Sequence, residues 1–334
     1  MTKYIAKRIL QSVIVLFIMS VIAFALINAA PGEPAAAIYG GQMDRLTQAE
    51  RERINTNLGL DKPLVTRYAN WLTEMLGGRM GYSYASGQSV NDIIAARMPN
   101  TLLLFVVSFA MTVFISMAVG LWAGLHPNTH LDRAITITSI TLNGIPSVLV
   151  AIALIFVFSV SLGWLPSSGA SSLFAASPGD RATHLVLPVI TIILSHVGSF
   201  SRFIQEGMKT ELKSYYVNVA LANHASKSDI YRGAMKNALV PFVNYAGTHV
   251  PSFFSGFVVV EAVFAYPGIG NMIVGAIPVK DYPVLMGGIL ITGVVVIVSM
   301  LAVDMIDLAL NPRLRKSVIK CRRRKKPTGK TGFG

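Results

Sequence analysis

Six long apolar runs constrain the fold of this chain more than any other feature of its sequence. Each approaches or exceeds the roughly 20 residues that a helix needs to cross a hydrocarbon layer about 30 Å thick. Of the 334 residues, 53% are hydrophobic and 13% are charged. The runs span residues 9–30, 101–125, 135–162, 185–204, 239–264 and 284–310. The sequence therefore predicts an all-α membrane protein with six transmembrane helices, not a soluble helical protein.

The first run has a second interpretation, as a signal peptide. Lys3, Lys7 and Arg8 precede it, and Asn28-Ala29-Ala30 resembles a cleavage site. Its apolar stretch is longer than the 7 to 15 residues of a signal-peptide core. We therefore expect it to be a retained transmembrane helix.

The distribution of Lys and Arg predicts the orientation. With the N-terminus inside, the cytoplasmic pieces are residues 1–8, 126–134, 205–238 and 311–334, which hold 3, 1, 5 and 10 Lys and Arg. The longest outer piece, 31–98, balances seven basic against seven acidic residues. The positive-inside rule thus places both termini in the cytoplasm. We expect the basic tail to meet anionic membrane lipid and not nucleic acid.

Residues 31–98 contain start and stop signals for short helices. Thr47 and Glu50 have capping-box spacing before a short helix that should stop near Gly59. A second helix is predicted from Pro63 to Leu76, and a third from Ser89. One face of the second helix is apolar and consists of Leu64, Tyr68, Trp71, Leu72 and Met75. This pattern indicates a small amphipathic helical insertion outside the membrane.

Motifs for catalysis are absent from the sequence. It has no His-Glu-x-x-His zinc-protease motif, no Gly-x-Ser-x-Gly nucleophile elbow and no phosphate-binding loop after a strand. The six histidines are scattered, and Pro127 separates His126 from His130, so no metal site is predicted. Cys321 is the single cysteine, which excludes a disulfide within the chain.

Two helices carry polar stripes, each within about 80° of arc at 100° per residue. One interpretation is that they line an aqueous translocation path, because polar groups in a bilayer must face protein or water. The other is interhelical packing, in which Ser and Thr are common. The stripe residues are Thr191, Ser195, Ser199 and Arg202 on one helix, and Asn244, Thr248, Ser252 and Ser255 on the other. Pro251 should kink the second of these helices.

The loop 205–238 is the most informative connection. Residues 214–226 read Ser-Tyr-Tyr-Val-Asn-Val-Ala-Leu-Ala-Asn-His-Ala-Ser, and residues 230–241 read Ile-Tyr-Arg-Gly-Ala-Met-Lys-Asn-Ala-Leu-Val-Pro. This pattern resembles the cytoplasmic coupling loop of binding-protein-dependent ABC importers. The resemblance implies that a short helix with small Ala220 and Ala222 sits in a groove of an ATPase subunit. The residues it assigns to coupling are Tyr216, Val217, Ala220, Leu221, Ala222, Asn223 and His224.

Further segments are similar to the first permease subunit of the peptide and nickel importer family. They occur in the family's order from residue 3 to about 315. Among them are Arg-Met-Pro-Asn-Thr-Leu at 97–102, Gly-Ile-Pro-Ser at 144–147, Val-Glu-Ala-Val-Phe at 260–264, Tyr-Pro-Gly-Ile-Gly at 266–270 and Asp-Tyr-Pro at 281–283. The resemblance implies a type I importer permease (MetI-like) fold in the bacterial inner membrane.

One position departs from the family pattern. The family usually has glycine where this chain has His224, and often lysine where it has Asn223. A glycine there suits a left-handed residue in a turn between two short helices. Asn and His tolerate that conformation better than most residues, so we expect the turn to be kept. The efficiency of coupling is what the change puts in doubt.

The resemblance also implies partners and a division of the chain. The partners are a second, similar permease, two ABC ATPase subunits that hold ATP and Mg, and an extracytoplasmic solute-binding protein. This chain would bind no cofactor and have no catalytic residues. Its expected parts are the N-terminal helix 1–30, the extracytoplasmic segment 31–98, the five-helix core 99–310 with the coupling loop 205–238, and the basic tail 311–334.

The competing function is an ion-coupled secondary transporter or channel that works without ATPase subunits. It would require an intramembrane carboxylate, for which Asp304 and Asp307 are the candidates, yet both lie late in the last helix. Glu261 is interpreted as a cap or brace. Related chains carry dipeptides, longer peptides, glutathione, metal chelates or nickel, and the sequence does not distinguish among these solutes.

Overall fold

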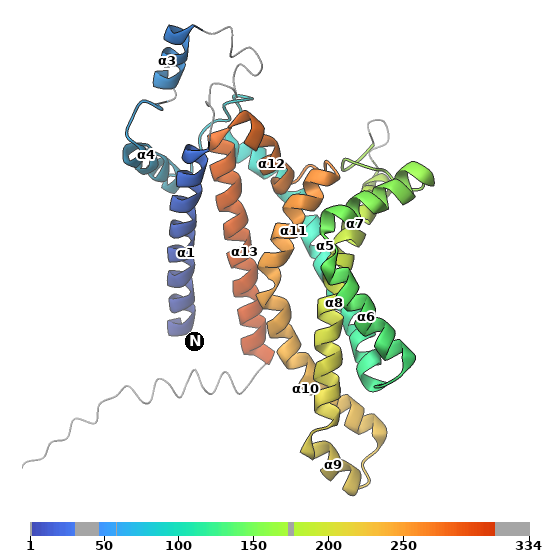
Figure 1. The fold of residues 1–334 in the computed structure, drawn as a ribbon. Coiled ribbons are helices and arrows are strands. Elements are labelled where there is room, and N and C mark those ends of the chain that lie inside the picture. The colour runs from blue at the N-terminus through green and yellow to red at the C-terminus, as the bar shows by residue number, and fades with distance from the viewer. Residues whose placement is uncertain (1, 31–46, 58, 173–176, 311–334) are drawn as a thin grey trace, which may run out of the picture.

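The computed structural model describes residues 2–30, 47–57, 59–172 and 177–310, and the helices there form an elongated bundle (Figure 1). Four helices are long and apolar enough to cross a membrane within this part of the chain: α1 (Thr2–Ala29), α5 (Val90–Leu125), α8 (Pro178–Leu212) and α13 (Tyr282–Leu310). Two bent helix pairs raise the number of candidate spans to six. The predicted all-α fold with six apolar spans is consistent with this count.

The first bent pair replaces the straight helix predicted for residues 135–162. It consists of α6 (His130–Gly144), α7 (Ser147–Leu154) and the π-helix η2 (Ile155–Ser161), and its two arms differ in direction by 100°. Ile145 has φ −93° and ψ 122°, the extended conformation that a residue before proline prefers. Pro146 cannot donate a backbone hydrogen bond, so α6 ends and a new helix begins.

The second bent pair confirms the kink predicted at Pro251. It joins α10 (Lys227–Thr248) to α11 (Val250–Val263) at an angle of 48°. Pro251 occupies the first turn of α11, where its missing N–H costs no helical hydrogen bond.

Close contact between α5 and α8 forms the centre of the bundle. A Cβ atom added at Gly120 would lie 2.5 Å from the Ser201 carbonyl oxygen, and one at Gly124 would lie 2.6 Å from Met208 Cβ. Glycine at these two positions lets the helix backbones approach one another. The main hydrophobic core contains the buried aromatic residues Phe200, Phe242, Phe253, Phe254 and Phe257.

The two helices that follow α1 in the sequence lie at one end of the bundle. We call this the cap end; it comprises α3 (Gln48–Asn57), α4 (Leu64–Leu76) and the start of α13. The predicted capping box is confirmed: the Thr47 N–H donates to Glu50 at 2.8 Å and the Glu50 N–H to Thr47 Oγ1 at 3.4 Å. The separate helix predicted from Ser89 is instead the first part of α5, which continues through Pro99. Residue 98, the predicted end of the extracytoplasmic segment, therefore lies inside a helix.

Specific contacts join the cap end to α1 and α13. Tyr68 packs edge-on against Phe24, with ring centroids 5.3 Å apart, and its hydroxyl lies 2.8 Å from Ser20 Oγ. Asp281 accepts hydrogen bonds from Ser83 Oγ at 2.5 Å and from the Tyr84 N–H at 3.0 Å. At the other end of α1 and α13, Arg8 forms an ion pair with Asp304 at 3.3 Å.

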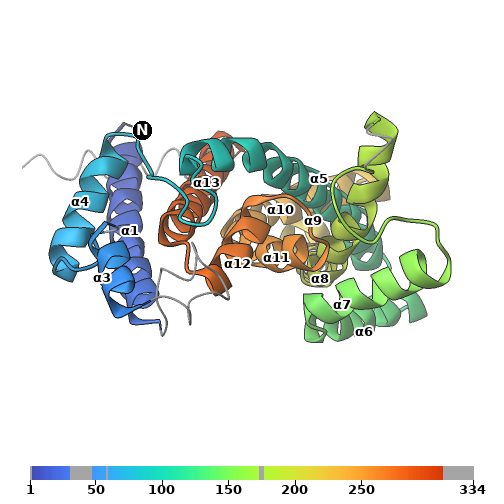
Figure 2. The same cartoon turned by 90° about the horizontal axis from the view of Figure 1, so that it is seen from above.

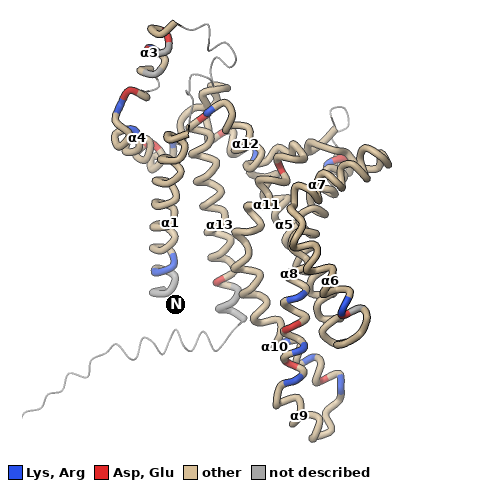
Figure 3. Tube along the Cα trace, in the orientation of Figure 1, with Lys and Arg blue, Asp and Glu red and all other residues tan. Residues whose placement is uncertain are grey.

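Viewed from above, α1, α3 and α4 lie on one side of the molecule and α6, α7 and α8 on the other, with α13 and α10 to α12 between them (Figure 2). Charged residues gather toward the two ends, and the middle of α1, α11 and α13 carries almost none (Figure 3). This distribution is what a helix bundle in a bilayer requires.

Candidate functional site

The predicted coupling loop forms a compact helical hairpin. Helix α9 (Tyr215–Ala222) lies between α8 and α10 and projects beyond them at the end opposite the cap end (Figure 1). We call this the coupling end. The Ser226 hydroxyl accepts the Asp229 N–H at 3.2 Å and caps α10.

Glu211 fixes the position of α9 between its neighbours. Its carboxylate accepts hydrogen bonds from the Tyr216 hydroxyl at 2.9 Å and from Asn237 Nδ2 at 3.2 Å. It thereby joins the end of α8 to both α9 and α10. Partial burial and the hydrogen bond to Glu211 raise the pKa of Tyr216, so this hydroxyl remains a donor at neutral pH.

The free face of α9 is mostly apolar, although it includes the exposed Asn218. Val217 is buried and anchors the helix, whereas the side chains of Tyr215, Val219 and Leu221 are 82%, 40% and 52% exposed. Ala220 is half-buried, and Ala222 is exposed. Exposed apolar side chains grouped on one short helix are typical of a surface that a protein partner covers.

His224 adopts the left-handed conformation that the sequence predicted for it. Its φ is +53°, and it follows directly after α9. The Ala225 N–H donates to the Ala220 carbonyl at 3.0 Å and the His224 N–H to that of Leu221 at 3.0 Å, which closes the helix end. The turn is therefore kept without glycine.

The two polar stripes meet in one small cavity. Its volume is about 230 Å³, and it lies between α7, α8 and α11. The lining residues are Ser147, Ile192, Ser195, His196, Ser252, Ser255, Gly256 and Val260. We call it the serine pocket. Of the predicted path residues, it brings together Ser195, Ser252 and Ser255.

The other stripe residues lie outside the serine pocket. Thr191 is fully buried, and its hydroxyl donates to the Leu187 carbonyl at 2.9 Å within its own helix. Ser199 donates to Asn143 Oδ1 at 2.8 Å, an interhelical contact of the packing type. Asn244 and Thr248 are exposed along α10, before the bend at His249.

Sequence reasoning did not include Ser147 or His196 among the path residues. Ser147 reaches the pocket because the 100° bend turns α7 toward α8. The His196 ring stacks on Phe253 at 3.9 Å, and its Nδ1 lies 3.0 Å from the Ile192 carbonyl oxygen. The proline in Gly-Ile-Pro-Ser was the available signal for the bend. No group of three His, Cys, Asp or Glu that could hold a metal ion exists among the described residues.

Glu261 is the cap of a helix that the sequence analysis did not assign, α12 (Ile269–Val279). Its buried carboxylate accepts the Gly270 N–H at 2.7 Å, the Asn271 N–H at 3.3 Å and the Thr101 hydroxyl at 2.7 Å. Thr101 Oγ1 in turn accepts the Ile269 N–H at 2.8 Å. The first three N–H groups of α12 are thus satisfied by α5 and α11.

Two glycines make this approach possible. A Cβ atom at Gly268 would overlap the Glu261 carboxylate, and one at Gly270 would lie 2.5 Å from Val258 Cα. Asn100 adds a hydrogen bond to the Pro267 carbonyl at 2.9 Å. The motifs at 97–102, 260–264 and 266–270 therefore form a single structural unit.

We expect Glu261→Ala to lower the melting temperature of the purified protein by about 5 °C. It leaves the Thr101 hydroxyl and two buried N–H groups without an acceptor, which costs about 3 kcal/mol. Glu74→Ala is the matched control, because Glu74 pairs with Arg79 at a site where both side chains are more than half exposed. Equal melting temperatures for the two variants would show that Glu261 does not brace α12.

Comparison with known proteins identifies relatives along almost the whole chain. The family described as binding-protein-dependent transport system inner membrane component matches residues 116–316, and its N-terminal counterpart matches residues 1–105. The oligopeptide transport system permease protein AppB of Bacillus subtilis is 34% identical over 94% of this chain and 99% of its own length. The glutathione transport system permease protein GsiC of Escherichia coli (strain K12) is 32% identical over the same shares.

Proposed function

The chain belongs to the family of binding-protein-dependent transport system inner membrane components, as a permease subunit of an ABC importer, and we propose that it admits peptides or a related solute. The observation that best supports a role as an ABC importer subunit is the exposed, mostly apolar face of α9 at the coupling end. A transporter that acts alone has no need of such a surface.

We propose that α9 docks on an ABC ATPase subunit. Tyr215, Val219 and Leu221 would enter a groove of that subunit, and Ala220 and Ala222 would allow close approach. The full machine would contain two ATPase subunits, a second permease and an external binding protein. ATP and Mg would bind to the ATPase subunits, and this chain would contribute no catalytic group.

The serine pocket is proposed as one wall of the translocation path. Its serine hydroxyls and the His196 ring offer hydrogen bonds to amide and carboxyl groups of a peptide. The pocket lies on α8 and α11, and α8 connects directly to α9 through Lys213 and Ser214. Movement of α9 by an ATPase subunit would therefore be transmitted to the pocket.

The positive-inside rule supports an orientation with both termini and the coupling end in the cytoplasm. The five Lys and Arg of loop 205–238 belong to that end. Retention of ATPase subunits on α9 tests this orientation, because those subunits bind ATP in the cytoplasm. Residues 311–334 and Cys321 lie outside the described residues, and we propose contact of this basic segment with anionic lipid.

The solute class is proposed from the relatives. AppB is an oligopeptide permease and GsiC is a glutathione permease, and both transported solutes contain peptide bonds. A short peptide is consistent with the hydrogen-bonding groups of the serine pocket. Identifying the ligand of the accompanying binding protein by calorimetry would narrow the class.

The alternative, an ion-coupled transporter, is disfavoured by the partners of two carboxylates within the apolar helices. Asp304 pairs with Arg8, and Glu261 caps α12. The side chain of Asp307 lies outside the described residues.

We expect uptake of a short peptide into proteoliposomes to require ATP, the ATPase subunits and the binding protein. A protonophore and a sodium ionophore should leave uptake unchanged. Uptake by the permease alone, abolished by either ionophore, would contradict the ABC importer mechanism.

A further inference from the structure

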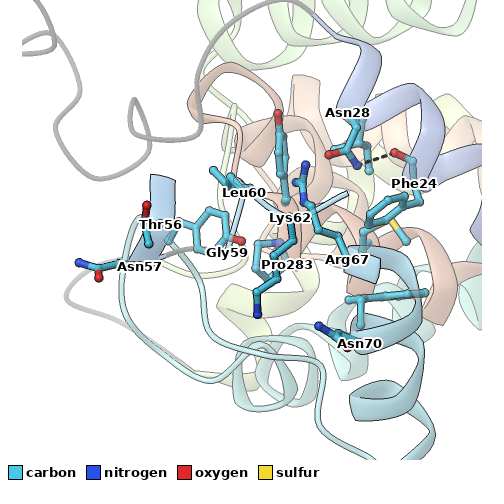
Figure 4. Close-up of a pocket in the computed structure, with 15 residues that line it drawn as sticks. Phe24, Asn28, Thr56, Asn57, Gly59, Leu60, Lys62, Arg67, Asn70 and Pro283 are labelled. Atoms are coloured by element: carbon cyan, nitrogen blue, oxygen red, sulfur yellow. Dashed lines mark hydrogen bonds between the residues drawn. The ribbon is translucent and has the colours of Figure 1, made fainter. Parts of the chain in front are cut away.

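A second, larger cavity lies at the cap end, far from the serine pocket. Its volume is about 400 Å³, and fifteen residues line it (Figure 4). They come from the end of α1, from α3 and α4 with the loop between them, from Tyr84 and from the start of α13. The two cavities share no lining residue, and α1 and α8 lie on opposite sides of the molecule (Figure 2).

The lining of this cavity is basic. It contains Lys62 and Arg67 but no Asp or Glu, and the carboxamides of Asn28, Asn57 and Asn70 add further donors. Arg67 is half-buried, and its guanidinium carbon lies 6.0 Å from the centre of the Phe24 ring. No described carboxylate forms an ion pair with either cation. Such a lining favours a group with anionic oxygens.

The charge of Arg67 acts inside the cavity. Figure 4 shows its side chain extending from α4 toward Asn28 at the end of α1. Burial raises the pKa of the Tyr84 hydroxyl, and the positive charge of Arg67 acts in the opposite direction. An anion in the cavity would therefore meet a cation that already projects into it.

The depth of the cavity identifies the source of the anion. The apolar spans 6–29 of α1 and 282–305 of α13 both end at its walls, so it lies at the level of the lipid headgroups. Phe24, Trp71, Tyr84 and Tyr282 surround it, and aromatic rings gather at this level of a membrane. On the same face of α1, toward the middle of the span, Phe17 and Val21 are 52% and 41% exposed, an apolar surface suited to acyl chains.

We propose that this cavity binds the headgroup phosphate of a membrane phospholipid, with Arg67 and Lys62 as its cationic ligands. The acyl chains would lie along the exposed side of α1. A bound phospholipid would then fill the space between α1, α4 and α13, the helices through which the cap end is joined to the bundle.

The experiment is native mass spectrometry of the purified, delipidated transporter complex with added phosphatidylglycerol. Arg67→Gln and Lys62→Gln should each weaken binding of one lipid equivalent about fivefold, and the double variant about 25-fold. Arg79→Gln is the matched control. It removes the same charge from the cap end, but Arg79 is exposed, pairs with Glu74 and does not line the cavity.

Two further probes separate the sources of the anion. Diacylglycerol with the same acyl chains should not occupy this site, because it has no phosphate, and inorganic phosphate should bind far more weakly than the lipid. Unchanged phosphatidylglycerol binding by the double variant would overturn the proposal, as would equal binding of diacylglycerol or of inorganic phosphate. Lys62 is exposed, so its substitution gives a result even where Arg67→Gln impairs folding.

Discussion

Ala222→Glu is expected to separate the permease from its ATPase subunits while leaving the helix bundle intact. Ala222 is exposed at the end of α9, so a larger side chain there does not disturb the folded chain itself. Once α9 is docked, the carboxylate would be buried without a partner at a cost of about 3 kcal/mol, which weakens association on the order of 100-fold. Retention of ATPase on a tagged permease and solute-stimulated ATP hydrolysis are the measurements.

Two other variants define what the loss means. Ser228→Glu adds the same charge to the exposed first turn of α10, where a helix end favours it, and it should retain the ATPase. His224→Gly should also be mild, because it removes a left-handed side chain from the turn. Full retention and stimulated hydrolysis with Ala222→Glu would show that α9 does not dock an ATPase.

Ser252→Trp is expected to reduce solute uptake by on the order of tenfold, with the transporter still assembled. Ser252 is exposed and lines the serine pocket, whose volume is about 230 Å³, and an indole at this position would occupy a substantial part of it. The estimate corresponds to about 1.4 kcal/mol of overpacking when the solute passes. ATP-driven uptake in proteoliposomes and size-exclusion chromatography of the complex measure the two effects separately.

Two controls accompany this prediction: a small side chain at the same position, and the same indole at a position outside the pocket. Ser252→Ala should transport normally, because it leaves the pocket open. Val298→Trp places an indole on the exposed side of α13, outside the pocket, and should have little effect. If Ser252→Trp transports normally and only its stability falls, the polar stripes serve packing and the proposed path is wrong.

Local sequence signals predicted much of the secondary structure. The apolar runs located the spans, the Thr47–Glu50 spacing located the start of α3, and Pro251 located the bend before α11. His224 was correctly expected to be left-handed. All of these features depend on residues within a few positions of one another, so the sequence alone contains the forces that produce them.

The sequence was less informative about helix boundaries next to prolines. The run 135–162 is long enough for one straight span, yet Ile145 and Pro146 divide it at a 100° bend. The helix expected from Ser89 has no stop before the membrane, because Pro99 is tolerated inside α5. In both places the apolar pattern predicted helix correctly. The effect of the proline depended on its structural surroundings, because Pro146 separates two helices whereas Pro99 lies inside one.

By itself, the sequence determined that this chain is a helical membrane protein, where its apolar spans lie, and which turn follows α9. Only the tertiary structure decided which side chains meet. Glu261 caps α12 together with Thr101, which is 160 positions away, and Ser147 joins Ser195 and Ser252 through the bend of α7. Helix periodicity fixes the face on which a residue lies, whereas its neighbour across an interface depends on how helices pack, which a single sequence does not encode locally.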